Sequence, residues 1–150
     1  MKGKKVMTMK AREYLQQLQD IDVSINQDLS RLEAMRINAT GQGAIRYDRD
    51  KVQTSPQDRL CSDVCNIVTF NDRLNERIDR FIDAKEQVIE QIRGLHNATF
   101  NQVLFKVYVE YKSLKQTAVE MGRCYTFVRD KHKEALAAFE KTYADLKYLT

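Results

Sequence analysis

The stretch Ser113–Leu136, SLKQTAVEMGRCYTFVRDKHKEAL, decides the fold of this chain, because it reads as two short helices joined by a tight turn. Three residues at spacings of four and six mark the helix crossing, the turn and the packing position of this unit: Ala118, Gly122 and Val128. A small residue suits the point where the first helix crosses the second, and a glycine suits the point where the chain leaves that helix with positive φ. The β-branched Val128 then fits against the first helix. The stretch therefore predicts a helix-turn-helix.

Both helices of this unit carry an apolar inner stripe, and the second also carries positive charge. The stripe consists of Leu114, Thr117 and Met121, followed by Phe127, Ala135 and Leu136, and the charges are Arg129, Lys131 and Lys133. This pattern is typical of a unit whose second helix lies in the major groove of DNA and reads bases. The same spacing also occurs by chance in antiparallel helix pairs that bind no DNA, so the spacing alone leaves both interpretations open.

The composition of the chain favours helices throughout. Of its 150 residues 31% are charged and 43% hydrophobic, with one proline, five glycines and no tryptophan, which favours long helices over a sheet. The net charge of +4 permits a polyanionic partner without requiring one. Met1–Arg12 contains five basic residues and no acid, which predicts a solvated arm that can add phosphate contacts.

The three cysteines predict no disulfide framework, and we expect a reducing compartment. Cys61 and Cys65 lie four residues apart on a predicted helix, but only the distant His96 and His132 are available to complete a metal site. We therefore interpret both as ordinary half-buried helix cysteines and expect no metal or other cofactor. No apolar run approaches the ~18 residues of a membrane span, and the N-terminus lacks the apolar core of a secretion signal, so we expect no membrane association.

Two long amphipathic helices precede the helix-turn-helix. In the first, from about residue 9 to 39, apolar residues recur at the 3.5-residue period of a coiled coil. The second begins at Asp58, and its most regular stripe is interrupted by two polar positions, Asn71 and Lys85, of the kind that fixes register. That stripe consists of Leu60, Val64, Ile67, Asn71, Leu74, Ile78, Phe81, Lys85, Val88, Ile92 and Leu95. Residues 40–57, with Gly41, Gly43 and Pro56, break the pattern and predict a mobile connector.

These patterns predict an all-α protein in two parts. Residues 1–96 form a long, coiled-coil-like antiparallel hairpin with a basic N-terminal arm, and residues 97–150 form a small helix-turn-helix bundle. A two-helix hairpin has little core of its own, so it must pack on the bundle or on a second copy, and we expect a homodimer. Asn97–Tyr111 predicts a third helix that braces the helix-turn-helix, and the final helix is expected to continue through residue 150.

The chain resembles the phage and prophage late-transcription regulators of the RinA/ArpU type, whose C-terminal module looks like region 4 of bacterial sigma factors. Three pieces carry the resemblance over nearly the whole chain. They are KAREYLQQLQDIDVSINQDLSRLEAMR, DKVQTSPQDRL and VYVEYKSLKQTAVEMGRCYTFVRDKHKEAL. The second piece, similar to the family's loop before the second helix, is the most specific.

This resemblance implies a DNA-binding surface at named positions. Tyr125, Thr126, Arg129 and Lys133 would face the groove, Arg123 would contact phosphate at the turn, and Lys112 and Lys115 would touch the backbone. Two residues depart from the family pattern. Cys124 stands where the family usually has a capping serine, and Lys131 stands where it has an apolar residue. Both departures predict a more loosely packed reading helix.

The leading interpretation is therefore a phage-encoded transcription regulator in the cytoplasm of a bacterial host, with double-stranded DNA as its partner and host RNA polymerase as a further candidate partner. Two alternatives remain: a DNA-packaging protein of the small-terminase kind, and a protein-interaction module with a degenerate helix-turn-helix. Enzymatic motifs such as phosphate loops, paired-histidine metal motifs and nucleophile elbows are absent from the sequence, so we expect no enzyme.

Overall fold

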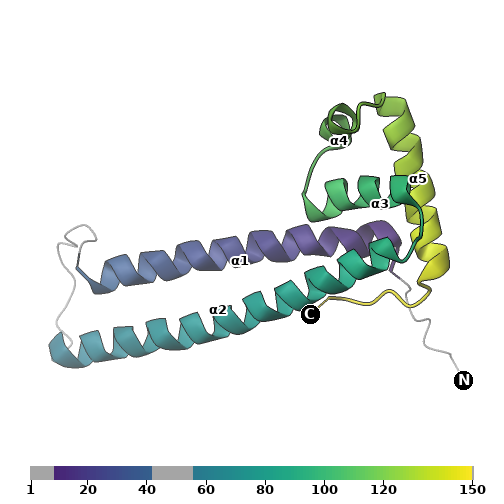
Figure 1. The fold of residues 1–150 in the computed structure, drawn as a ribbon. Coiled ribbons are helices and arrows are strands. Elements are labelled where there is room, and N and C mark those ends of the chain that lie inside the picture. Colours follow the sequence, from purple (N-terminus) through teal and green to yellow (C-terminus); the bar gives the residue numbers. More distant parts are fainter. Residues whose placement is uncertain (1–8, 42–55, 150) are drawn as a thin grey trace, which may run out of the picture. The chain divides into compact units, whose positions relative to one another are not determined.

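The computed structural model describes residues 9–41 and 56–149, and every regular element in these ranges is a helix (Figure 1). In order along the chain they are α1 (Ala11–Ala39), α2 (Pro56–Arg93), α3 (Ala98–Leu104), η1 (Phe105–Val109), α4 (Leu114–Met121) and α5 (Tyr125–Thr142). The predicted all-α architecture, with a helical hairpin followed by a small helix-turn-helix bundle, is confirmed. The expected basic arm and connector fall almost entirely outside the described residues.

The chain divides into two compact units that do not follow the expected boundary at residue 96. The first unit joins the chain up to Asp22 to everything from Arg80 onward, and the second spans Val23–Asp79. Residue 96 lies inside the first unit, because the start of α1 and the end of α2 contribute to the core on which the bundle rests. We describe each unit by itself.

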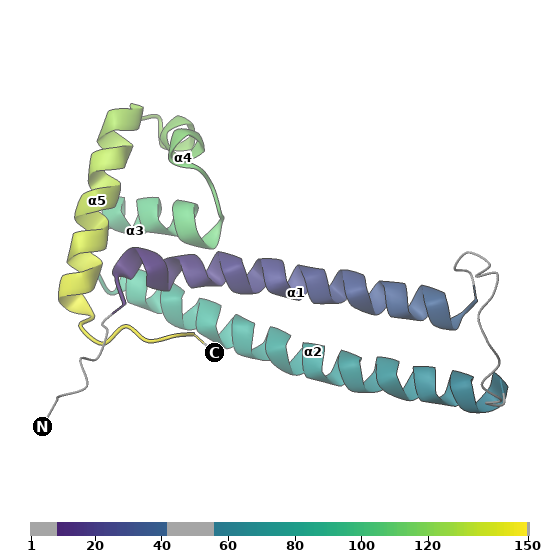
Figure 2. The ribbon, with the colours of Figure 1, turned by 180° about the vertical axis from the view of Figure 1, so that it is seen from behind.

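The second unit is a pair of antiparallel helices formed by the later part of α1 and the earlier part of α2 (Figure 2). Ile25, Leu32 and Leu74 are buried between them. Asp28, which interrupts the apolar series of α1, accepts an ion-paired hydrogen bond from Arg77. The same guanidinium donates to the Ser24 hydroxyl at 2.8 Å.

Two residues of the expected apolar stripe of α2 are not part of this contact. Leu60 is 53% exposed and Val64 is 48% exposed. These residues are therefore exposed although they follow the coiled-coil period.

The first unit contains the main hydrophobic core. It is formed by buried residues from both long helices, the bundle and the C-terminal tail: Ala11, Tyr14, Leu15, Leu18, Val88, Ile92, Leu104, Tyr108, Val109, Ala135, Phe139 and Leu146. Because residues near both ends of the chain meet in one core, the bundle depends on the start of α1 for its packing.

The predicted third helix is present, but its second half is a π-helix. After α3 the five residues of η1 form wider turns, closed for example by the Glu110 N–H donating to the Phe105 carbonyl at 3.0 Å. Leu104 and Val109 lie five residues apart and are both buried. The wider turn places residues of this spacing on one face, which an α-helix does not do.

The expectation that the final helix continues through residue 150 is wrong. α5 ends at Thr142, and Tyr143 has an extended backbone. Beyond it, the tail is held by specific contacts instead of helical hydrogen bonds. The Tyr143 hydroxyl donates to the Gln91 carbonyl at 2.8 Å, Leu146 is buried, and the Leu149 N–H donates to the Gln17 side chain at 2.9 Å.

Candidate nucleic-acid interface

The first helix of the predicted helix-turn-helix, α4, is closed at both ends by its own sequence. At its start the Ser113 hydroxyl accepts from the Gln116 N–H at 3.2 Å while the Gln116 side chain accepts from the Ser113 N–H at 3.0 Å, which is a capping box. At its end Gly122 adopts φ 62°, the left-handed conformation that glycine tolerates best. The Arg123 N–H then donates back to the Ala118 carbonyl at 3.0 Å. The expected role of Gly122 is confirmed.

Only three residues separate the end of α4 at Met121 from the start of the second helix, α5, at Tyr125. Cys124 occupies its N-cap position in an extended conformation, and its side chain makes no capping hydrogen bond. The Val128 N–H donates to the Cys124 carbonyl at 3.2 Å, so the first turn of the helix forms without help from the side chain. The poor cap expected from the sequence is present.

A small cluster locks the two helices together. Val128 and Ala118 are buried with Val103 of α3, as the spacing predicts. Thr117 is fully buried, and its hydroxyl donates to the Ser113 carbonyl at 2.9 Å, which satisfies the polar group. Farther along, Ala135 and Phe139 anchor α5 in the main core. α5 is therefore held at both ends of its inner face, as a rigid reading helix requires.

The four residues expected to face the groove lie on the side of α5 away from this packing. Tyr125 is 44% exposed, Thr126 and Lys133 are exposed, and the Arg129 side chain is partly exposed. Tyr125, Arg129 and Lys133 are spaced by four residues and share one face of the helix, and Thr126 lies at the edge of that face. The structure thus brings all four together.

Acidic neighbours neutralise part of the positive charge of the bundle. Arg129 donates to the carboxylate of Asp130, the adjacent residue, at 3.0 Å. Lys131 pairs with Glu134 at 2.7 Å and also lies 5.9 Å from the centre of the Phe127 ring. The family's apolar position is therefore filled here by a half-buried lysine whose stem packs and whose charge is paired.

Lys112, expected at the DNA backbone, belongs to a network that the sequence analysis did not anticipate. Its ammonium lies 2.8 Å from a carboxylate oxygen of Glu110 and 2.8 Å from one of Glu120. Lys106 completes the network at 2.6 Å from Glu120. Hydrogen bonding to these cations lowers the pKa of Glu110 and of Glu120, and hydrogen bonding to the two carboxylates raises the pKa of Lys112. The sequence predicts only one pair of this network, Lys106 and Glu110, because these two residues lie four apart on an expected helix.

Three of the expected cations have no carboxylate partner among the described residues: Lys115, Arg123 and Lys133. Lys115 and Lys133 are exposed, and the Arg123 guanidinium lies 5.4 Å from the centre of the Phe127 ring. The ring orients that guanidinium without neutralising it.

One exposed residue in this unit was not anticipated. Val119 on α4 is 81% exposed, although its neighbour Ala118 is buried. It lies between Ala118, which packs against α5, and Glu120, which joins the lysine network. No sequence signal separates it from the buried positions, because it directly follows one of them.

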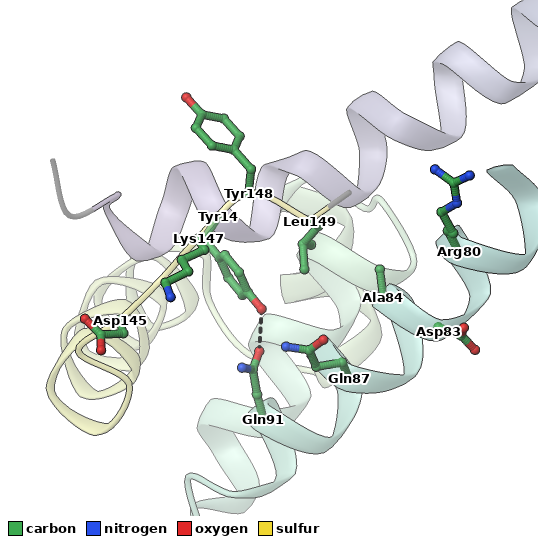
Figure 3. Close-up of a pocket in the computed structure, with 10 residues that line it drawn as sticks. All are labelled: Tyr14, Arg80, Asp83, Ala84, Gln87, Gln91, Asp145, Lys147, Tyr148 and Leu149. Carbon is green, nitrogen blue, oxygen red and sulfur yellow. Dashed lines mark hydrogen bonds between the residues drawn. The ribbon is translucent and has the colours of Figure 1, made fainter. Parts of the chain in front are cut away.

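A hollow lies away from the α4–α5 turn, between both long helices and the tail (Figure 3). Its volume is about 340 Å³, and Tyr14 donates to Gln91 across it at 2.8 Å. Its lining carries charges of both signs: Arg80 and Lys147, and Asp83 and Asp145. This mixed lining selects no ligand class, so the α4–α5 surface remains the candidate site.

The cysteines are exposed, contrary to the expectation that Cys61 and Cys65 are half-buried. Cys61 and Cys65 lie on α2, and Cys124 is the N-cap residue of α5. Within residues 9–41 and 56–149, three or more cysteine, histidine or acidic side chains nowhere gather as a metal site would require. In the same ranges, none of the helices combines the length and apolar character needed to cross a membrane.

Comparisons with protein-family models, with curated proteins and with solved structures all found no match for this chain.

Proposed function

We propose that this chain is a non-enzymatic, phage-encoded transcription regulator that binds double-stranded DNA in the cytoplasm of a bacterial host through α4 and α5. The observation that carries the proposal is the exposed face of α5. It presents Tyr125, Thr126, Arg129 and Lys133 together, while the opposite face is fixed in two hydrophobic clusters. A rigid helix with one polar, partly cationic face is what major-groove reading needs.

The residues divide between affinity and specificity. Lys115, Arg123 and Lys133 would contact phosphates, which gives salt-dependent attraction without sequence preference. Tyr125 and Thr126 would contact base edges. The Arg129 guanidinium would give up its hydrogen bonds to Asp130 and donate to an acceptor on a base instead. Lys112 would contribute less than the family pattern implies, because two carboxylates already hold it. The helical hairpin would serve oligomerisation or contact with host RNA polymerase.

The test is the binding of the full chain to duplex DNA from its own phage promoters, measured by fluorescence anisotropy between 50 and 200 mM salt. Three phosphate contacts predict that binding weakens about 40-fold across this range, at about 0.9 counterions released per phosphate. Absence of binding by folded protein at the lowest salt would refute the proposal.

Two lysines on α5 provide a matched comparison. Lys133→Ala removes an exposed, unpaired charge and should weaken binding and lower the salt slope by about one. Lys131→Ala removes a charge that Glu134 already neutralises, so its effect on binding should be much smaller. Equal effects of the two substitutions would mean that the exposed face of α5 is not the contact surface.

A second candidate function is binding to a host protein. The pairing of Arg129 with Asp130 and of Lys131 with Glu134 favours it, because it reduces the positive charge of α5, and the exposed Val119 would be an apolar contact for such a partner. Under this alternative, Val119→Ser would abolish partner binding while Lys133→Ala would leave it unchanged.

A further inference from the structure

An uncovered apolar stripe runs along α2 in the second unit. It consists of Leu60, Val64 and Val68, which are 53%, 48% and 53% exposed. Because they are spaced by four residues, their side chains lie on one side of the helix. The adjacent Cys61 and Cys65 are exposed as well. We call Leu60, Val64 and Val68 the uncovered stripe.

The surroundings of the uncovered stripe are unusually free of charge. The twelve residues Leu60–Asn71 contain a single charged residue, Asp63, although 31% of the whole chain is charged. Asp63 is half-buried, whereas the stripe is exposed. A solvated helix surface in this protein would be expected to carry several charges, so this segment has the composition of an interface.

Among the described residues of the second unit, the hydrogen bond, the ion pair and the cation–ring contact between α1 and α2 do not involve the uncovered stripe. Ion pairing and hydrogen bonding join Arg77 to Asp28 and Ser24, and the Arg31 guanidinium lies 5.0 Å from the centre of the Phe70 ring. These contacts, with the buried Leu32 and Leu74, complete the pairing of α1 and α2. The uncovered stripe is therefore a second apolar surface of α2, beyond the one that α1 occupies.

We propose that a second copy of this chain covers the uncovered stripe, with α2 packed antiparallel on α2 of the partner about a twofold axis at Val64. In this register Leu60 meets Val68 of the partner subunit, and Val64 meets its own counterpart. The three side chains are then self-complementary, as a twofold interface requires. The inference deepens the oligomerisation role within the proposed function, but it does not depend on DNA binding.

The low charge of this segment favours a second copy over a charged partner, and the small area predicts a weak contact. Asp63 is the only charged residue of Leu60–Asn71, so covering this segment with a second copy brings few like charges together. Three half-exposed side chains from each copy, with their polar borders, make a small interface. It falls below the roughly 1,200–2,000 Å² that stable interfaces bury. The dimer should therefore dissociate on dilution.

Sedimentation equilibrium of the full chain at micromolar concentrations tests the proposal, with two valine variants. Val64→Glu places a charge on the twofold axis and should weaken dimerisation at least tenfold. Val23→Glu is the matched control, because Val23 is 49% exposed in the same unit but has only polar residues three and four positions away: Gln19, Asp20, Asn26 and Gln27. It should leave the dimer unchanged. Helical circular dichroism shows that both variants are folded.

Cross-linking provides a measurement that needs no change in the stripe. The antiparallel register brings Cys61 close to Cys65 of the partner subunit along one edge of the contact. A short bismaleimide should therefore join two copies of a Cys124→Ser variant. It should fail to join a variant with Cys61→Ser and Cys65→Ser, which keeps the exposed Cys124 as a control for random collision.

The inference is overturned if the wild-type chain is monomeric throughout the micromolar range, if both valine variants associate equally well, or if cross-linking runs through Cys124. Its failure is distinguishable from failure of the proposed function. A dimer that binds no DNA at low salt would remove the regulator and keep this interface, whereas a monomer that binds DNA would do the reverse.

Discussion

The imidazole of His132 on α5 is stacked on the Tyr108 ring of η1, with centroids 5.6 Å apart, and its Nε2 lies 2.9 Å from the tyrosine hydroxyl. Burial lowers the pKa of His132, and the nearby Arg12 guanidinium lowers it further. Burial also raises the pKa of Tyr108 to about 12, against the opposing effect of Arg12. The pair is therefore neutral at physiological pH and joins the candidate reading helix to the π-helix.

The neutral state of His132 predicts how stability depends on pH. In the unfolded chain His132 has its ordinary pKa of 6.5, whereas in the folded chain its pKa is lower. As the pH falls below 6.5, the unfolded state therefore binds protons before the folded state does. We expect the free energy of unfolding to be highest above this pH and to decrease between pH 7.5 and 5.5. Urea denaturation at a series of pH values measures it.

His132→Gln is the control for this prediction. It removes the titrating group, so the decrease between pH 7.5 and 5.5 should become shallower even if the variant is less stable at pH 7.5. An unchanged pH slope would show that other groups dominate.

The N-cap of α5 offers a stabilising substitution. Cys124 makes no side-chain hydrogen bond to the first turn, although its backbone already has the extended conformation of a cap. Cys124→Ser supplies a hydroxyl acceptor and should raise the free energy of unfolding by about 1 kcal/mol. Cys124→Ala is the control and should not stabilise the protein. A serine variant no more stable than the alanine variant would contradict the prediction.

Gly94 and Tyr143 are expected to be energetically coupled. A Cβ atom at residue 94 would collide with the Tyr143 hydroxyl, which is held there by its hydrogen bond to the Gln91 carbonyl. Gly94→Ala should therefore destabilise the protein by about 1–3 kcal/mol. Tyr143→Phe alone should cost about 1 kcal/mol for the lost hydrogen bond.

In the double variant the phenyl ring no longer carries the colliding oxygen. The two changes together should cost clearly less than the sum of the single changes, as a double-mutant cycle in urea would measure. Simple additivity would mean that the tail moves away from Gly94 without cost.

The helix-turn-helix bundle should not fold without the long helices. A fragment of residues 97–150 lacks Leu15, Leu18, Val88 and Ile92, which are buried against Leu104 and Phe139 in the full chain. We expect this fragment to show no cooperative thermal transition by circular dichroism. The matched control joins Asp22 to Arg80 by a short flexible linker, which keeps the whole first unit, and should unfold cooperatively. A cooperative transition of the fragment alone would contradict the prediction.

Local patterns predicted the parts of the fold that local interactions determine. Ala118, Gly122 and Val128 have the predicted places, because a helix crossing and a left-handed turn impose residue types over a few positions. The long helices likewise follow from their apolar period.

Features that depend on distant partners were not predictable in the same way. Val64 has the period of a buried residue, yet it is exposed, because periodicity identifies an apolar face without showing what covers it. Lys112 looked free because it lies in the connection between η1 and α4, and one of its partners, Glu120, lies eight residues farther along in α4. The end of α5 at Thr142 depends on contacts of the tail with Gln91 and Gln17, which no local pattern reveals.

The discontinuous composition of the first unit has a consequence for how this protein can change in length. In the sequence, Val23–Asp79 is inserted between the two parts of that unit, to which it is joined through α1 and α2. It contributes no residue to the main core. Deleting one heptad from each helix within this insert would preserve the 3.5-residue phase on both sides. Homologues that differ in length are therefore expected to differ here, by matched steps of seven residues in α1 and in α2, while the helix-turn-helix bundle keeps its packing in the main core.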